Sequence, residues 1–253
     1  MRATTIRTLA AIATATAVGV ATVVTGGIAA QAGAAYELQM ATTGQGEFPI
    51  RWNPCQTEIT YKVNTSLARE KGRSTASART RARTEITRAF GEIAEATGVT
   101  FRYTGTTRDI PTGDDWWEQQ GIDEEIVVAY VDRDKSSTQS TLLSSGAWGE
   151  GGQVYSYEGD TVISGRGFAV FDRDKARQMR AGFGTGARRG NLVLHELGHV
   201  MGLDHVSDKD QLMYPTLSNK TPNGFAAGDR AGLAQLGQAG GCIVDAEEFW
   251  EGS

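Results

Sequence analysis

The sequence predicts an α+β fold, in which helices pack on one mixed and twisted β-sheet. Strand-like segments occupy much of the chain, with one long helical segment between the first two of them. The clearest strand, residues 126–131, is continuously apolar and rich in β-branched side chains, which is typical of a central strand buried on both faces. Two further helical segments follow near the carboxyl end. The sequence has no internal repeat, so we expect one domain with one core.

The first elements alternate between strand and helix. Residues 52–63 have strand character, and residues 77–97 have the spacing of a long amphipathic helix. Gly98 is expected to end this helix. Residues 99–103 then alternate apolar and polar side chains, which favours a strand buried on one face. The apolar stripe of the helix consists of Ile86, Phe90, Ile93 and Ala94.

Loops and short strands follow. Residues 109–123 are predicted to form a loop that carries Trp116 and Trp117. Two adjacent tryptophans could form a surface binding feature, but one buried ring is the simpler expectation. Residues 153–157 and 168–171 are expected to be short strands.

The last third of the chain carries the remaining helices. The glycine-rich residues 182–190 lack the spacing of a phosphate-binding loop and lead into a helix. Val193, Leu197 and Val200 recur on one face of that helix, which is therefore expected to pack on the sheet. Residues 229–236 form a short closing helix in this prediction.

All three histidines of the chain lie within residues 195–205, in the pattern H-E-x-x-H-x-x-G-x-x-H. His195 and His199 are four residues apart, so a helix places them on one face, where both can bind one Zn²⁺. Gly202 permits the sharp turn that returns His205 to the same ion. Three imidazoles leave a fourth position open, as in catalytic zinc sites.

Two other interpretations of this pattern exist. One is a solvated helix that carries H-E-x-x-H by chance, and the third histidine and the glycine argue against it. The other is a structural zinc site, which would need four ligands, whereas Cys55 and Cys242 lie far away in the sequence. Glu196, next to His195, is expected to act as general base toward a metal-activated water rather than as a ligand.

A methionine follows the histidines, in the segment Leu212-Met213-Tyr214-Pro215. Met213 could be ordinary core, or a polarizable floor beneath the metal-binding histidines. The long zinc motif followed by this turn resembles the metzincin peptidases, and specifically the matrixin (matrix-metalloprotease-like) family. The resemblance extends more weakly over most of the chain. It includes Arg51-Trp52, the segment Gly98-Val99-Thr100-Phe101, and Gly228-Asp229-Arg230.

The resemblance implies a metzincin (zincin-like) catalytic domain with an active-site helix, a second long helix and a short carboxyl-terminal helix. It further implies one catalytic zinc, protein or peptide substrates, and a monomer. The chain departs from the family at Val206, where many matrixins have serine, and at Pro215-Thr216-Leu217, where they often have Pro-x-Tyr. A different metzincin subfamily therefore stays an alternative.

By the same resemblance, five residues are candidates for the substrate pocket. The substrate-binding strand is expected within residues 145–157, although a glycine-rich surface loop is an equal alternative there. The five candidates are Asn191, Tyr214, Pro215, Ala147 and Trp148.

The amino terminus has the pattern of an export signal. Arg2 and Arg7 precede a long uncharged segment, and small residues flank two candidate cleavage sites near residue 34. The prediction is a signal peptide over residues 1–34, a short loose arm over 35–50 and the peptidase domain over 51–253. An uncleaved membrane anchor is the alternative; with cleavage, we expect a secreted protein without stable membrane association. The net charge of −5 argues against nucleic acid as a partner.

Two cysteines in an exported chain suit one disulfide, between Cys55 and Cys242. The alternative is that Cys55 reaches the metal and keeps the enzyme latent. Several aspartates could bind Ca²⁺, although solvated turn residues are the simpler interpretation. They are Asp132, Asp134, Asp160, Asp172 and Asp174.

The sequence as a whole predicts a secreted zinc-dependent endopeptidase. A secreted zinc-binding module for adhesion or capture is the alternative from another functional class. Glu196 argues against that alternative, because a binding module needs no general base.

Overall fold

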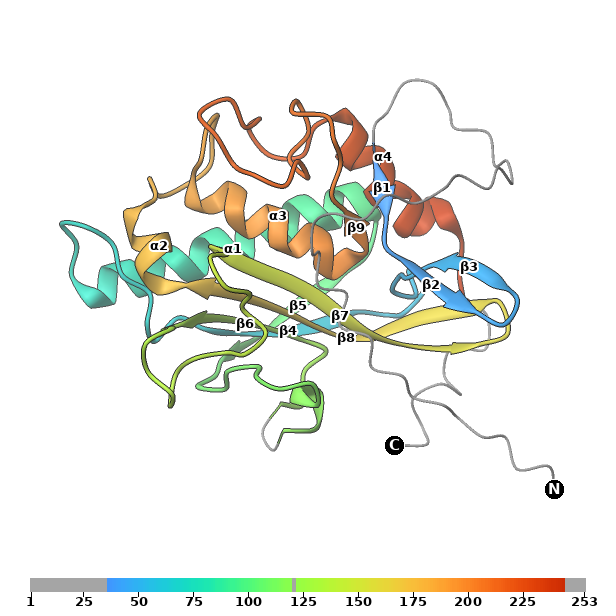
Figure 1. Cartoon of the computed structure of the whole chain (residues 1–253), viewed down its shortest axis with the longest axis horizontal. Helices are drawn as coiled ribbons and strands as arrows, with labels where there is room; N and C mark the ends of the chain where they lie inside the picture. Colours follow the sequence, from blue (N-terminus) through green and yellow to red (C-terminus); the bar gives the residue numbers. More distant parts are fainter. Residues whose placement is uncertain (1–35, 120–121, 244–253) are drawn as a thin grey trace.

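The computed structural model describes residues 36–119 and 122–243. The predicted signal peptide, residues 1–34, lies outside the described residues. A five-stranded mixed sheet has the strand order β5-β4-β6-β8-β7 (Figure 1). Its strands are β4 (Ile59–Asn64), β5 (Phe101–Thr106), β6 (Ile126–Val131), β7 (Gly149–Glu158) and β8 (Thr161–Asp172). All neighbours pair in parallel except β7 and β8, which pair antiparallel. Strand β7 is the last in this order and is therefore an edge strand.

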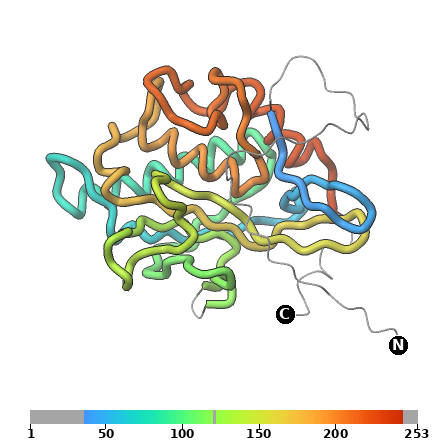
Figure 2. Tube along the Cα trace, viewed as in Figure 1, coloured from blue at the N-terminus to red at the C-terminus, as the bar shows by residue number. Residues whose placement is uncertain are grey.

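The longer helices lie on one face of this sheet (Figures 1 and 2). The helices are α1 (Thr75–Thr97), α2 (Arg173–Gln178), α3 (Arg189–Met201) and α4 (Ala227–Leu236), with short 3-10 turns η1 (Trp116–Glu118) and η2 (Gln238–Gly240). The loops around η1 cover the opposite face, where Trp116 is fully buried and Trp117 is half-buried. This arrangement confirms the α+β prediction and the single buried tryptophan ring.

Strand β6 is the centre of the sheet, because all six of its residues are buried. Alternate side chains face two different apolar layers. Ile126 and Val128 join α1 and α3 in one layer, and Val127 and Ala129 join Trp116 in the other. This strand is therefore continuously apolar because both of its faces are covered, as expected from the sequence.

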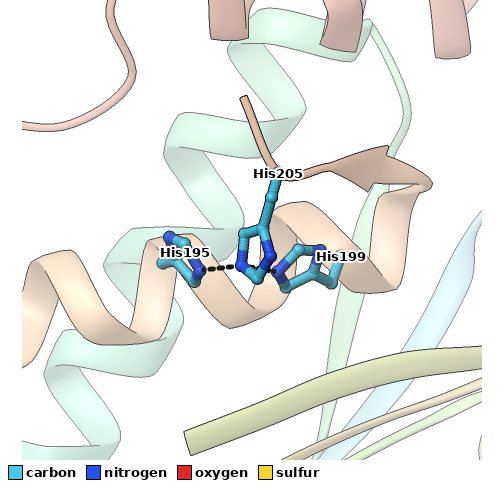
Figure 3. Close-up of side chains that lie close together, drawn as sticks. All are labelled: His195, His199 and His205. Carbon is cyan, nitrogen blue, oxygen red and sulfur yellow. Dashed lines mark hydrogen bonds between the residues drawn. The ribbon is translucent and has the colours of Figure 1, made fainter. Parts of the chain in front are cut away.

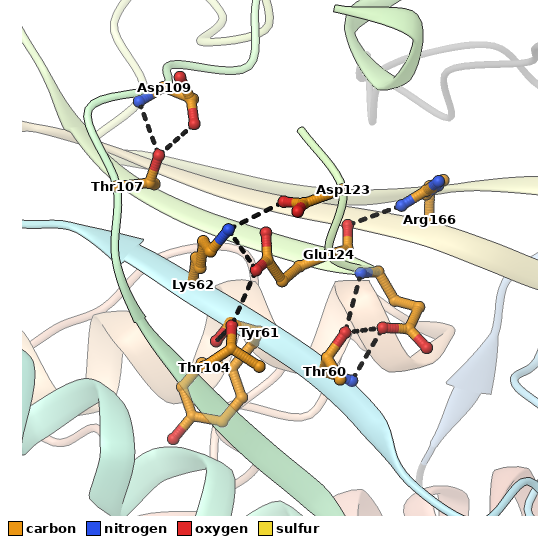
Figure 4. Close-up of polar contacts among 10 residues, drawn as sticks. Thr60, Tyr61, Lys62, Thr104, Thr107, Asp109, Asp123, Glu124 and Arg166 are labelled. Atoms are coloured by element: carbon orange, nitrogen blue, oxygen red, sulfur yellow. Dashed lines mark hydrogen bonds and ion pairs between the residues drawn. The ribbon is translucent and has the colours of Figure 1, made fainter. Parts of the chain in front are cut away.

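Polar contacts fix the entry into β6 (Figure 4). Lys62 on β4 pairs with Asp123 at 2.8 Å and also with Glu124. Thr104 on β5 donates to Glu124 at 3.0 Å, and Arg166 on β8 donates to the Glu124 main-chain carbonyl at 2.8 Å. Glu124 thus joins three neighbouring strands at one end of β6.

Helix α1 matches its prediction closely. The Ser74 side chain accepts a hydrogen bond from the Ser77 backbone N–H, and the helix ends at Gly98, which has a φ of 73°. On the buried face, Phe90 stacks on Tyr61 of β4 with ring centroids 3.8 Å apart. The apolar stripe read from the sequence is therefore the surface that joins α1 to the sheet.

Strands β7 and β8 form one long hairpin of ten and twelve residues. The predicted segments, residues 153–157 and 168–171, are only parts of it. Glycines at Gly149, Gly151 and Gly167 hid the strand pattern, because glycine carries no side chain that could reveal an alternation.

The loose arm predicted for residues 35–50 is wrong for the described part, residues 36–50. It forms β1 (Glu37–Leu38), β2 (Met40–Thr43) and β3 (Gly46–Pro49). β2 and β3 pair with each other, while β1 pairs with β9 (Leu203–Asp204), far away in the sequence. The strand β1 depends on this distant partner, so local pattern could not reveal it, whereas β2 and β3 form a short hairpin whose polar, glycine-bearing sequence resembles a loop.

The predicted disulfide between Cys55 and Cys242 is present, with Cα atoms 5.3 Å apart and a sequence separation of 187 residues. Since these are the only cysteines of the chain, no thiol is left to act as a metal ligand. Within residues 36–119 and 122–243, no helix is both long enough and apolar enough to cross a membrane.

Candidate metal centre and cleft

The three histidines meet at one point, although one of them lies outside the helix (Figure 3). His195 and His199 project from the same face of α3, which ends at Gly202 with a φ of 108°. The chain then turns through β9 and returns His205 to the other two. The Nε2 atom of His205 lies 3.1 Å from the Nε2 atoms of both His195 and His199.

Main-chain carbonyls orient the two helical histidines. The Nδ1 atom of His195 lies 2.8 Å from the Leu212 carbonyl oxygen, and that of His199 lies 2.8 Å from the Leu203 carbonyl oxygen. A carbonyl only accepts, so both Nδ1 atoms carry the proton and both Nε2 atoms present lone pairs. This is the usual orientation of histidines that bind a metal through Nε2.

The donor set fits one zinc ion. Four tetrahedral ligands at 2.0–2.1 Å from zinc would be separated by about 3.3 Å, close to the separation of the Nε2 atoms here. Burial is the main cause that lowers the pKa of all three histidines: that of His195 falls well below its usual value, and that of His199 falls to about 3. The imidazoles are therefore neutral near pH 7, which is the form that binds a metal.

Glu196 lies against the edge strand of the sheet. A Cβ atom on Gly149 would be 2.8 Å from its Cγ atom, and a Cβ atom on Gly151 would overlap its main-chain oxygen. Burial raises the pKa of the Glu196 carboxyl well above its usual value, and the negative charge of Glu150 adds to this effect. A bound cation would lower the pKa again. The carboxyl group is thus buried and closely confined by β7, in the same cleft as the histidines.

Met213 lies beneath the histidine helix and is only 1% exposed. Its sulfur lies against Gly198, the residue before His199. The fully buried Asp229 on α4 accepts hydrogen bonds from the backbone N–H groups of Leu212 at 2.7 Å and Met213 at 3.2 Å. This role of Asp229 was not predicted from the sequence, where the only signal is an acidic residue in the first turn of the closing helix.

A cleft of about 610 Å³ opens over the three histidines and Glu196. Of the five predicted pocket residues, Ala147, Trp148 and Pro215 line this cleft. The Trp148 ring is 41% exposed at the rim, with the Lys175 amine 5.6 Å from its centroid. Residues 149–151 of β7 form one wall, so an edge strand does border the cleft.

Asn191 and Tyr214 do not line the cleft. Asn191 is fully buried, and its amide donates to the carbonyl oxygens of Gly184 at 2.8 Å and Gly186 at 2.9 Å. It therefore ties the glycine-rich lead-in to α3. Tyr214 lies beneath the Lys209 amine, 5.9 Å from its ring centroid.

Three of the five candidate calcium ligands, Asp132, Asp172 and Asp174, have side-chain partners in the protein. Asp172 caps α2 through the N–H groups of Asp174 and Lys175 and pairs with Arg133 at 2.8 Å. Asp132 and Asp174 pair with Arg173 at 2.8 and 3.3 Å. Asp160 lies in the turn between β7 and β8. Arginines thus balance three of these carboxylates, and calcium binding stays a prediction from the sequence alone.

Comparison with known proteins decides the family. The profile of the matrixin family matches residues 51–237, about three quarters of the chain. The chain belongs to the matrixin family. Membership supports a zinc metallopeptidase.

Two curated matrixins are similar over shorter stretches. Matrix metalloproteinase-20 of Homo sapiens is 30% identical over 97 residues, which are 36% of this chain and 20% of that protein. Matrilysin of Felis catus is 37% identical over 78 residues, which are 30% of this chain and 28% of that protein. The chain therefore matches less than a third of the length of either of these relatives.

Proposed function

We propose that this matrixin is a secreted, zinc-dependent endopeptidase. The observation that carries the proposal is the meeting of three Nε2 atoms beside one buried carboxylate in an open cleft. His195, His199 and His205 would be the metal ligands, and Glu196 the general base. Met213 would support the histidine helix from below.

A zinc ion at this position would supply a water of lowered pKa and a positive charge that polarises the substrate carbonyl. Glu196 would accept the proton of the attacking water and pass it to the leaving amine. Its buried position suits proton transfer, because a raised pKa brings a carboxylate closer to the pH of the reaction. The three histidines remain neutral ligands throughout.

The edge strand β7 offers a place for an extended substrate. Its residues 149–151 border the cleft, and a peptide can pair with an edge strand through main-chain hydrogen bonds. Trp148 and Pro215, at the borders of the same cleft, would contact substrate side chains. The departure from the family at residues 215–217 concerns this part of the cleft, so we expect it to influence the preferred cleavage site.

Glu196→Gln tests the role of the carboxylate. It keeps the shape of the side chain but cannot accept the proton, so cleavage of a denatured protein substrate should fall by about 10²–10⁴-fold. Both proteins should contain equal zinc by elemental analysis, because Glu196 is not a ligand. Equal cleavage by the two zinc-loaded proteins would contradict the proposed base. Inactivity of both, with zinc bound, would instead favour the adhesion or capture module.

Secretion rests on the export signal predicted for residues 1–34. Expression of the full chain in an exporting host should yield a protein in the medium whose amino terminus lies near residue 35. Retention of the intact chain in the membrane would favour the uncleaved anchor.

A further inference from the structure

The segment of residues 36–39 lies beside the metal centre, about 160 positions from the histidines in sequence. Its strand β1 pairs with β9, and the partners are Glu37 with Asp204 and Leu38 with Leu203. The Gln39 backbone N–H continues this ladder and donates to the Gly202 carbonyl at 2.8 Å. The segment therefore runs along the whole connection between the end of α3 and His205.

The Gln39 side chain extends the contact to the histidines themselves. Its Nε2 atom donates to the Leu203 carbonyl oxygen at 3.2 Å and lies 3.5 Å from Nδ1 of His199. That same carbonyl accepts the proton of His199 Nδ1 at 2.8 Å. Gln39 and His199 thus share one acceptor, which fixes the plane of the imidazole.

Gln39 is itself held in place. It is 7% exposed and lines the cleft. Its Oε1 atom accepts from Gln153 on β7 at 3.2 Å, and Gln153 in turn accepts from the Ser164 hydroxyl on β8. A buried chain of hydrogen bonds therefore runs from the β7–β8 hairpin through Gln39 to the Leu203 carbonyl oxygen, which also accepts from His199.

Groups that orient metal ligands contribute to affinity, because a ligand held in its binding geometry loses less freedom when the metal binds. Two of the three residues between α3 and His205, Leu203 and Asp204, form β9, and the main-chain ladder that holds it comes from residues 37–39. Without that ladder, the direction from which His205 approaches would be poorly defined.

We propose that residues 36–39 support zinc binding at the metal centre. Gln39 is a positioning residue, which orients His199 and holds the connection to His205. The proposal rests on the proposed function only in taking zinc as the metal. It has a consequence for processing. A chain cut before Tyr36 keeps the full site, whereas a chain cut after Gln39 loses its support and binds zinc weakly.

Zinc affinity, measured by competition with a chromophoric chelator, tests the proposal in the chain that begins at Tyr36. Gln39→Ala should weaken zinc binding by about 10–100-fold. Gln39→Glu should weaken it as well, because a carboxylate cannot donate to the Leu203 carbonyl. Gln45→Ala is the matched control, since Gln45 is an exposed glutamine in the same amino-terminal region. A chain that begins at Met40 should bind most weakly.

A second measurement separates positioning from general stability. Thermal unfolding of the metal-free proteins should show that Gln39→Ala is still folded at the temperature of the zinc titration, although it melts lower than Gln45→Ala because Gln153 loses a buried partner. Wild-type zinc affinity in Gln39→Ala, or a lowered melting temperature with unchanged zinc affinity, would overturn the proposal. A starting chain that binds no zinc would instead overturn the proposed function, and the two failures are distinguishable because that chain is measured first.

Discussion

At Gly149 and Gly151, only glycine leaves enough space for Glu196. Both lie where any Cβ atom would meet Glu196, at its side chain in one case and at its main chain in the other. The sequence pointed to this segment only as a glycine-rich loop or a substrate strand. The reason for its glycines is visible only in the structure, because Glu196 is 45 or more positions away in the sequence.

Gly149→Ala should lower activity by displacing the Glu196 carboxyl group. The added Cβ atom would lie 2.8 Å from Cγ and from one carboxylate oxygen, so the side chain must move. A displacement of about 1 Å can lower a rate about 10²-fold, and we expect kcat to fall by about 10–100-fold. Gly44→Ala serves as the control, because a Cβ atom there meets nothing within 4 Å.

Steady-state kinetics and zinc content check this expectation together. Zinc content should match that of the wild type, since the three atoms nearest to the added Cβ all belong to Glu196 and not to a histidine. An unchanged kcat in Gly149→Ala would show that the approach of β7 does not hold the carboxylate.

The clustering of the three histidines was predictable because their spacing is a local property of a helix and one turn. Their partners were not. Leu212 and Leu203 act through backbone carbonyls, which any residue provides, and Asp229 and Gln39 come from distant segments. The three histidines could be picked out from the sequence, whereas the groups that orient them could be found only from the fold.

At the scale of elements, a buried ion pair joins α3 to α1. Arg189, at the first turn of α3, has a side chain that is 1% exposed and contacts Glu85 of α1 at 2.6 and 3.1 Å. Glu85 also accepts from the Gly182 backbone N–H at 2.7 Å. The pair thus fixes the amino-terminal end of the histidine helix against the rest of the core.

Glu85→Gln should destabilise the fold by about 3–5 kcal/mol, because it leaves a buried guanidinium without its main counter-charge. Glu92→Gln is the matched control on the same helix, since its partner Arg88 is 60% exposed. That exposed pair should contribute only about 0.3–0.5 kcal/mol. Urea unfolding measures both, and equal small losses would contradict a structural role for the buried pair.

Elements with strong local patterns were predicted well, and elements that depend on distant partners were not. Helix α1 could be predicted from its apolar stripe and the glycine that ends it, and strand β6 from its continuous apolar sequence. The strand β1 was missed because it is completed only by β9, and the local hairpin of β2 and β3 was missed because its short, polar and glycine-bearing sequence resembles a loop. The helix α2 was missed because its cap, Asp172, was considered only as a solvated turn residue or a calcium ligand.

At the scale of the whole molecule, a covalent and a non-covalent link tie the carboxyl-terminal end of the described residues to the segment before β4. The disulfide joins Cys55, just before β4, to Cys242, just after η2. Arg51 reinforces it by donating to the Gly241 carbonyl at 2.7 Å. Neither cysteine lines the cleft, so this link supports the fold rather than the chemistry. The fold class and the cysteine pair were predictable, whereas the strand order was not, since no local pattern encodes it.

The proposed function requires above all that three imidazoles hold one zinc ion. Elemental analysis of the purified wild-type protein, beside His205→Ala, tests this directly. We predict about one zinc per chain in the wild type and far less in His205→Ala, with circular dichroism spectra that show both chains folded. Removal of zinc with a chelator should abolish peptide cleavage by the wild type, and added zinc should restore it. A folded wild-type chain that contains no zinc and takes none up, or a His205→Ala chain that keeps a full equivalent, would contradict the account.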